Sequence, residues 1–312
     1  MDLIILLARF AGDILALILL YDFFVQPFRF YGMDPLTRFV WGAARKICAP
    51  FETLSRKLIQ VPDRDLTPLF ALAIVVFCRG LLYAAGVMVS RPDPRVLALG
   101  VTLSFQELFT RLALPLLLFV VYADIQLSRH QVTFIGNVPV MMVHDIAKRF
   151  IVLIRKLLPS YRPLLVFLVV AAHLIVFQWA LVVVTLLPFT GTSALQAFPP
   201  ILCPEGGTLI ESPLLALPVI ALSVVRTFLF GIFILLLLQM LAGFSGLDPY
   251  DRMTLILGLV VAPWIDAARK WFPFARVGVI DFSVGILLLI LWILLDLLTG
   301  IVARIGASPG PL

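Results

Sequence analysis

Long apolar runs alternate with shorter basic segments along the whole chain. Six of these runs approach the length of about 20 residues that an α-helix needs to cross about 30 Å of hydrocarbon. They cover residues 3–21, 67–89, 97–122, 164–187, 214–241 and 279–302. This pattern predicts an all-α transmembrane protein with about six spanning helices.

The first apolar run could be a signal peptide, since it begins near the start of the chain. However, it lacks a basic start, carries Arg9 and Asp13 within it, and shows no small-residue cleavage site before Tyr21. We therefore expect this run to stay in the protein as a spanning helix.

The composition agrees with a membrane location. Hydrophobic residues make up 62% of the chain and charged residues only 13%, and the mean hydropathy is +1.10. So few polar side chains cannot cover a globule in water. The three cysteines, Cys48, Cys78 and Cys203, stand far apart and lack the paired spacing of a zinc site or a disulfide framework. We expect them to be packing residues.

Basic residues gather in three of the segments between the apolar runs. Residues 22–66, 123–163 and 242–278 contain 17 of the 24 Lys and Arg residues. Because cytoplasmic loops retain positive charge, these connectors are predicted to be cytoplasmic, with both termini outside. The net charge of +6 would suggest nucleic acid for a soluble protein, but here the basic residues flank membrane segments. Anionic lipid headgroups are therefore an expected partner, and nucleic acid is not.

The first and third connectors share a spaced pattern, which indicates an internal repeat. Each contains Gly-x-Asp-Pro-x-x-Arg, and later Ala-Pro-aromatic followed by four residues and a basic pair. The matching segments are Gly32 to Arg38 with Ala49 to Lys57, and Gly246 to Arg252 with Ala262 to Lys270. The middle connector is a weaker copy, with Gly136, Asn137, Pro139 and the pair Arg155-Lys156.

These repeats predict three tandem units of two spanning helices, each pair joined by an amphipathic interfacial connector of about 40 residues. The units cover residues 1–92, 93–190 and 213–312, and residues 191–212 form an external loop. Since each unit has an even number of spans, all three share one orientation, and we expect a pseudo-threefold bundle. The central prolines, Pro50 and Pro263, should kink or divide the connectors, and Thr67 and Ser283 should cap the next helices.

These residues resemble the repeat of the YggT family of small membrane proteins, called YlmG in plastids and Gram-positive bacteria. That repeat has an Asn/Asp-Pro entry, a connector with a central proline, a basic pair, and an Asp-x-Ser-Pro step into its second helix. The best matches are Asp34-Pro35, Pro50, Arg56-Lys57, Pro62 and Asp65-Leu66-Thr67-Pro68, with Asp248-Pro249, Pro263, Arg269-Lys270 and Pro273 in the third unit. Val284 replaces the final proline there.

The resemblance covers residues 3–89 and 214–302 well and 97–187 loosely. Three copies depart from the one or two that are usual in the family. The resemblance implies a bacterial inner membrane, or less favourably a plastid membrane. It also implies roles such as cytochrome b haem assembly, organisation of the membrane and nucleoid near the division machinery, or osmotic tolerance with ion movement.

Two sets of charged residues are candidate functional groups. The first set would dock lipid or partner proteins from the connectors: Arg38, Arg56, Lys57, Arg155, Lys156, Arg252, Arg269 and Lys270. The second set lies within the spans, where an ionisable residue is costly unless it is paired or hydrated: Arg9, Asp13, Arg79, Glu107, Arg111, Arg226 and Asp296.

The intramembrane set allows two interpretations. Arg9 with Asp13, and Glu107 with Arg111, are four residues apart and can pair on one helix face. Arg79 and Arg226 could then reach Glu107, Asp13 or Asp296, or extend to an interface. These pairs could fix how the helices pack, or they could line a path for ions or protons. We favour packing, because intramembrane charges pair with one another in either case.

The sequence contains no motif that we recognise as enzymatic. His173 lies within a span, but bis-His haem ligation would need a second histidine at membrane depth, so we expect no cofactor and no metal. The leading hypothesis is a non-enzymatic scaffold or assembly factor that binds anionic lipid and other membrane proteins, with a larger complex as one setting for this role. The alternative is an ion-conducting or osmotic-stress protein that uses the intramembrane Arg, Asp and Glu residues.

Overall fold

Within the part of the chain that the structure describes, six helices are long and apolar enough to cross a membrane. The computed structural model describes residues 2–31, 35–58, 65–88, 94–130, 138–157, 163–186, 188, 216–244, 252–277 and 280–306. The spanning helices are α1 (Asp2–Val25), α4 (Thr67–Met88), the continuous α5 (Pro94–Glu107) and α6 (Leu114–Arg129), α8 (Pro163–Leu186), α11 (Ala216–Phe244) and α13 (Ser283–Gly306). The predicted all-α, multi-pass fold is confirmed.

Each connector between paired spans contains helix. In the first connector, the 3₁₀ segment η1 (Gln26–Tyr31) precedes α2 (Pro35–Cys48), the 3₁₀ turn η2 (Ala49–Phe51) and α3 (Glu52–Leu58). The second contains α7 (Val138–Leu157). The third contains α12 (Arg252–Trp271), η5 (Pro273–Ala275) and a short antiparallel hairpin of β1 (Arg276–Val277) and β2 (Ile280–Asp281). The order of span, connector helix and span therefore occurs three times.

The two central prolines have different effects. Pro50 lies in the 3₁₀ turn that divides α2 from α3, as predicted. Pro263 instead lies inside α12, which continues as one helix. The predicted external loop, residues 191–212, and the entry motifs at Gly32 to Asp34 and Gly246 to Pro249 lie outside the described residues.

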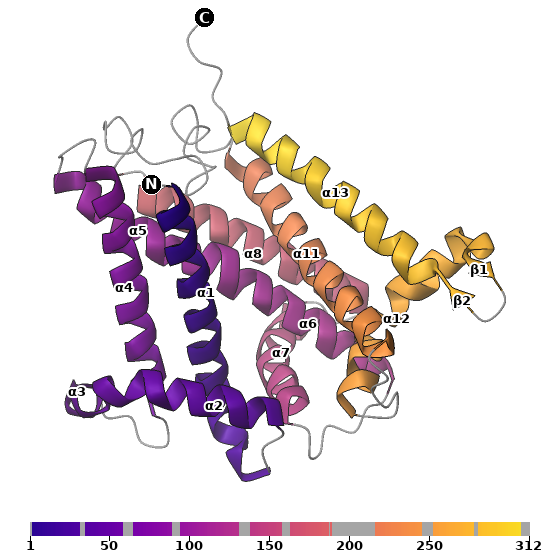
Figure 1. Cartoon of the computed structure of the whole chain (residues 1–312), viewed down its shortest axis with the longest axis horizontal. Coiled ribbons are helices and arrows are strands. Elements are labelled where there is room, and N and C mark those ends of the chain that lie inside the picture. Colours follow the sequence, from indigo (N-terminus) through magenta and orange to yellow (C-terminus); the bar gives the residue numbers. More distant parts are fainter. Residues whose placement is uncertain are drawn as a thin grey trace, which may run out of the picture.

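The helix pairs lie in a row. α4 packs against both α1 and α5, and α11 packs against α13, while α6 and α8 contact each other and α11. Figure 1 shows α1 and α4 at one edge of the molecule, α13 at the other, and the long α5–α6 helix between them. The predicted pseudo-threefold bundle is therefore wrong. Side-chain packing decides which helix pairs become neighbours.

The connector helices gather at one end of the bundle. In Figure 1, α2 crosses the lower ends of α1 and α4, and α7 and α12 lie toward the same end. The start of α1 and the end of α13 lie at the opposite end. The first and last helices of the bundle therefore have their outer ends on the side opposite the connector helices.

The third spanning helix is longer than the apolar run predicts. It extends from Pro94 to Arg129, 36 residues, which at 1.5 Å per residue is about 54 Å. The predicted span ended at residue 122, whereas the helix continues past Asp124 and Gln126. Both side chains are buried, 3% and 6% exposed, so the protein rather than water surrounds this end of the helix.

Two glycines bring α4 and α5 into close contact. A Cβ atom on Gly80 would lie 2.5 Å from Cα of Val101, and one on Gly100 would lie 2.7 Å from the carbonyl oxygen of Gly80. Small residues of this kind let helix backbones approach closely inside a membrane. Around this contact, Tyr83, Leu99 and Leu103 form part of a buried apolar cluster.

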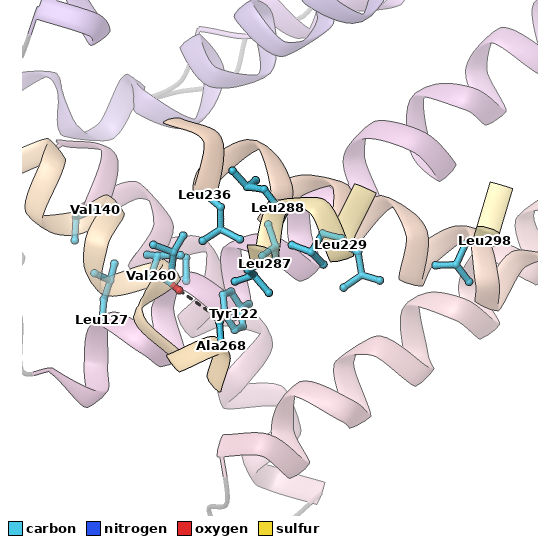
Figure 2. Close-up of a cluster of buried hydrophobic side chains, with 14 residues drawn as sticks. Tyr122, Leu127, Val140, Leu229, Leu236, Val260, Ala268, Leu287, Leu288 and Leu298 are labelled. Atoms are coloured by element: carbon cyan, nitrogen blue, oxygen red, sulfur yellow. Dashed lines mark hydrogen bonds between the residues drawn. The ribbon is translucent and has the colours of Figure 1, made fainter. Parts of the chain in front are cut away.

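A second buried cluster joins α6, α11, α12 and α13, and Figure 2 shows Tyr122 at its centre. The Tyr122 hydroxyl donates a hydrogen bond to the carbonyl oxygen of Val260 at 3.1 Å. It also accepts one from Nε1 of Trp264 at 2.8 Å. Val261 and Ala268 are fully buried. Much of the apolar face of α12 therefore packs on protein.

Asp65, rather than Thr67, caps the start of α4. Its Oδ1 atom accepts hydrogen bonds from the backbone N–H of Thr67 at 2.9 Å and from the Thr67 hydroxyl at 2.6 Å. The Thr67 hydroxyl also lies 2.7 Å from Oγ of Ser55 on α3. In addition, the side chain of Gln26 bonds both backbone polar groups of Asp65. This network fixes the connector to the start of the second span.

Candidate functional site

A cluster of charged side chains is buried where α1, α4 and α5 meet. α1 contributes Arg9 and Asp13, α4 contributes Arg79, α5 contributes Glu107, and the turn after α5 contributes Arg111. The side chains of Arg79 and Glu107 are 3% and 5% exposed, whereas those of Asp13 and Arg111 are 37% and 30% exposed. The cluster thus has a buried centre and two partly exposed edges.

Arg79 joins all three helices. Its Nη1 donates to Oδ1 of Asp13 at 2.6 Å, which links α4 to α1. Its Nε and Nη2 donate to the hydroxyl and the carbonyl oxygen of Ser104 at 2.8 and 2.6 Å, which links α4 to α5. The Ser104 hydroxyl in turn donates to the carbonyl oxygen of Val76 at 2.7 Å. Bonds to charged groups are the stronger ones, so Arg79 locks this helix junction.

Glu107 is the second centre of the cluster. Its Oε2 accepts a hydrogen bond from the Tyr83 hydroxyl at 2.9 Å. Its Oε1 lies 2.9 Å from Nη2 of Arg9 and 3.5 Å from Nη1 of Arg111. These two approaches are ion pairs without hydrogen-bond alignment, since Oε1 accepts no hydrogen bond within the described residues. Two guanidinium groups therefore compensate one buried carboxylate.

Local sequence explains why the cluster can form. Gly12 lies on α1 between Arg9 and Asp13, and a Cβ atom there would lie 2.9 Å from Cδ of Arg79. The missing side chain leaves room for the stem of the arginine. On α5, Ser104 and Glu107 are three residues apart and share a face, and on α4 Arg79 and Tyr83 are four residues apart and likewise share a face. The close contact at Gly80 and Gly100 brings these two faces together.

A π-helical turn follows Glu107 directly. It covers Leu108–Ala113 and includes Arg111 and the buried Thr110. Such turns are rare and are frequent at functional sites. Here the turn interrupts regular α-helical spacing where Arg111 approaches Glu107.

The cluster differs in part from the predicted pairs. Glu107 and Arg111 are paired four residues apart, as expected. Arg79 reaches Asp13, one of the predicted acceptors. Arg9, expected to pair with Asp13 within α1, reaches across to Glu107 on the next helix pair. Pairing between helices holds the bundle together, whereas pairing within one helix would not.

The two other intramembrane candidates lie outside the cluster. Arg226 is half-buried on α11, a helix that packs mainly on α13, α8, α12 and α6, and it makes an interaction of its own. Asp296 is exposed on α13. The structure therefore does not bring all seven predicted residues to a common axis.

The connector residues are exposed wherever the structure describes their side chains. Arg38, Lys57, Arg269 and Lys270 are exposed, and Arg269 lies 3.7 Å from Asp266. On α2, the helix that also carries Arg38, the guanidinium of Arg45 lies 5.1 Å from the Trp41 ring. The side chains of four predicted residues lie outside the description, although their helices are described: Arg56, Arg155, Lys156 and Arg252.

Sequence reasoning missed several polar partners. Tyr83 and Ser104 are not among the predicted residues, although their spacing from Arg79 and Glu107 on the same helix faces is a signal that could have found them. The predicted connector, residues 123–163, also included Asp124. In the structure this carboxylate is buried, lies 2.8 Å from Nδ1 of His144, and joins α6 to α7. His173 is exposed, and its Nδ1 donates to the carbonyl oxygen of Val169 in its own helix at 2.8 Å.

Comparison with protein-family models, with curated proteins and with solved structures finds no match to this chain. The chemistry of the cluster must therefore be judged from its geometry. Three arginines face two carboxylates, and four of these five charged groups lie within 3 Å of an opposite charge. Such a cluster is suited to holding helices together.

Proposed function

We propose that the protein is a non-enzymatic membrane scaffold or assembly factor of the YggT type. Its connector helices bind anionic lipid headgroups and partner proteins, and its spanning helices form a charge-locked bundle. The observation that carries the proposal is the contrast between these two parts. Charges inside the spans are largely occupied by one another, while basic side chains of the connectors are exposed at one end.

Exposed aromatic residues accompany the basic ones on the connectors. Phe39 is 75% exposed beside Arg38, and Trp271 is 71% exposed beside Lys270. Basic and aromatic side chains together are typical of helices that lie at a membrane interface. Each Lys or Arg near an anionic surface contributes about 1 kcal/mol of attraction. The connectors can therefore bind headgroups and leave part of their surface for proteins.

The positive-inside rule supports a cytoplasmic location for the connectors and an outside location for both termini. By resemblance to the YggT family, the membrane is the inner membrane of a bacterium, with a plastid membrane as the less favoured alternative. The partners are then membrane proteins that share this bilayer, as in a larger complex, together with anionic lipids.

A charge-reversal experiment tests the proposal. Arg45→Glu/Lys46→Glu and Arg269→Glu/Lys270→Glu would be introduced into the tagged protein. After gentle extraction, bound proteins and anionic lipids would be quantified by mass spectrometry. The matched control is Arg95→Glu/Arg304→Glu, which reverses two exposed charges at the opposite end of the bundle. We expect the connector variants to lose partners and lipid and the control to keep them. Equal retention in both would contradict the proposal.

The π-helical turn supports a second candidate function, ion movement through the bundle. It lies in a span beside a buried carboxylate, where an irregular helix is often functional. Under this alternative, Glu107→Gln would abolish ion flux in reconstituted vesicles, while Arg304→Gln would not. Flux that persists in Glu107→Gln would exclude Glu107 as part of the path.

A further inference from the structure

One carboxyl group lies on the outer face of a spanning helix. Asp296 is exposed on α13, a helix long and apolar enough to cross a membrane. It lies ten residues before Gly306, which is about 15 Å along the helix. Unlike Lys or Arg, a short Asp side chain cannot extend from this depth to the headgroups. A polar group is therefore presented to hydrocarbon, which is unfavourable without a partner.

Other intramembrane carboxylates of this chain have such partners. Asp13 pairs with Arg79, and Glu107 pairs with Arg9, each across a helix boundary. No described basic side chain forms an ion pair with Asp296, and it makes no hydrogen bond to the described residues. The chain itself thus shows the chemistry that satisfies a carboxylate at this depth, namely an arginine from another helix.

The face around Asp296 is shaped for another helix. Gly285, Leu289, Trp292, Asp296 and Gly300 follow one another at intervals of three or four residues, so they form one stripe, and all are exposed. A Cβ atom added to Gly285 or Gly300 would meet no other atom within 4 Å. Gly300, one turn from Asp296, would let a second backbone approach the carboxylate closely.

We propose that this face of α13 docks a transmembrane helix of a different protein, one that carries an Arg or Lys opposite Asp296. The inference rests on the proposed scaffold function and names the chemistry of one partner. A second copy of this chain fits less well. A twofold contact through α13 would place Asp296 against Asp296, and like charges repel. The arginines Arg9 and Arg79 already lie on carboxylates of their own bundle.

The test measures energy transfer between the labelled full-length protein and a synthetic 24-residue Leu/Ala transmembrane peptide in phosphatidylcholine vesicles. Three peptides differ only at the central position, which is Arg, Leu or Glu. We expect the Arg peptide to associate at least roughly tenfold more strongly than the Leu peptide, and Asp296→Leu to remove this preference. Asp296→Arg should reverse it in favour of the Glu peptide. Thr299→Ala, an exposed change on the same helix, is the control.

Gly300→Leu separates helix packing from simple charge attraction. Because a Cβ atom added at this exposed position meets no other atom within 4 Å, we expect the variant to fold normally, yet it should weaken binding of the Arg peptide. Equal association of all three peptides, unchanged binding in Asp296→Leu, or unchanged binding in Gly300→Leu would overturn the proposal. Self-association of the protein that depends on Asp296 would overturn the choice of partner. Since phosphatidylcholine carries no net charge, these results do not depend on the basic connectors, so failure here would leave the scaffold proposal standing.

Discussion

Replacing Arg79 with methionine tests whether the buried cluster holds the bundle together. Methionine keeps a flexible apolar stem but removes the donors to Asp13 and Ser104. Breaking one side of a buried ion pair costs about 3–5 kcal/mol. In the Arg79→Met variant the Asp13 carboxylate loses this partner, but its side chain is 37% exposed, so it is partly solvated or reaches the membrane boundary. We therefore expect the lower end of this range, a loss of about 3 kcal/mol in the free energy of unfolding.

The assay is reversible unfolding in mixed micelles, with SDS as the denaturant and far-ultraviolet circular dichroism as the signal. A double-mutant cycle with Asp13→Leu isolates the pair, and we expect a coupling energy of about 1–2 kcal/mol. Arg304→Met, an exposed change at the end of α13, should stay within about 0.5 kcal/mol of the wild type. If Arg79→Met matched this control, or if its effect and that of Asp13→Leu simply added, the cluster would not hold the helices together.

Three further predictions concern packing and capping. Gly100→Val should destabilise the α4–α5 contact by about 1–3 kcal/mol, because its Cβ would lie 2.7 Å from the Gly80 carbonyl oxygen. Gly42→Ala is the control, because a Cβ there meets open space and should cause no such loss. Thermal unfolding measures both variants. Tyr122→Phe should lower the free energy of unfolding by about 1–2 kcal/mol, since it removes the acceptor for Trp264 and the donor to Val260. Unchanged stability would argue against this, whether the Trp264 fluorescence shifts to the blue or does not change. Asp65→Ala should cost about 0.5–2 kcal/mol through loss of the cap on α4, and Asp65→Asn should retain most of the stability in the same SDS titration.

Much of the architecture could be predicted from the sequence alone. The apolar runs determine the number and approximate bounds of the spanning helices, because hydrocarbon requires every backbone polar group to be bonded within a helix. The positions of α4 and α8 agree with the predicted runs to within one residue at each end. The spacing of Glu107 and Arg111 was enough to predict their pairing, because residues four apart share one helix face.

Only the tertiary structure decided how these helices are combined. Lipid and protein interior are both apolar, so an apolar run carries no signal for which helix becomes its neighbour. Small local features settle this instead, such as the close approach at Gly80 and Gly100 and the space beside Gly12 that admits Arg79. For the same reason the sequence could name Asp13, Glu107 and Asp296 as costly charges but could not show which would be buried in pairs. The fold places the first two inside the bundle and turns Asp296 outward.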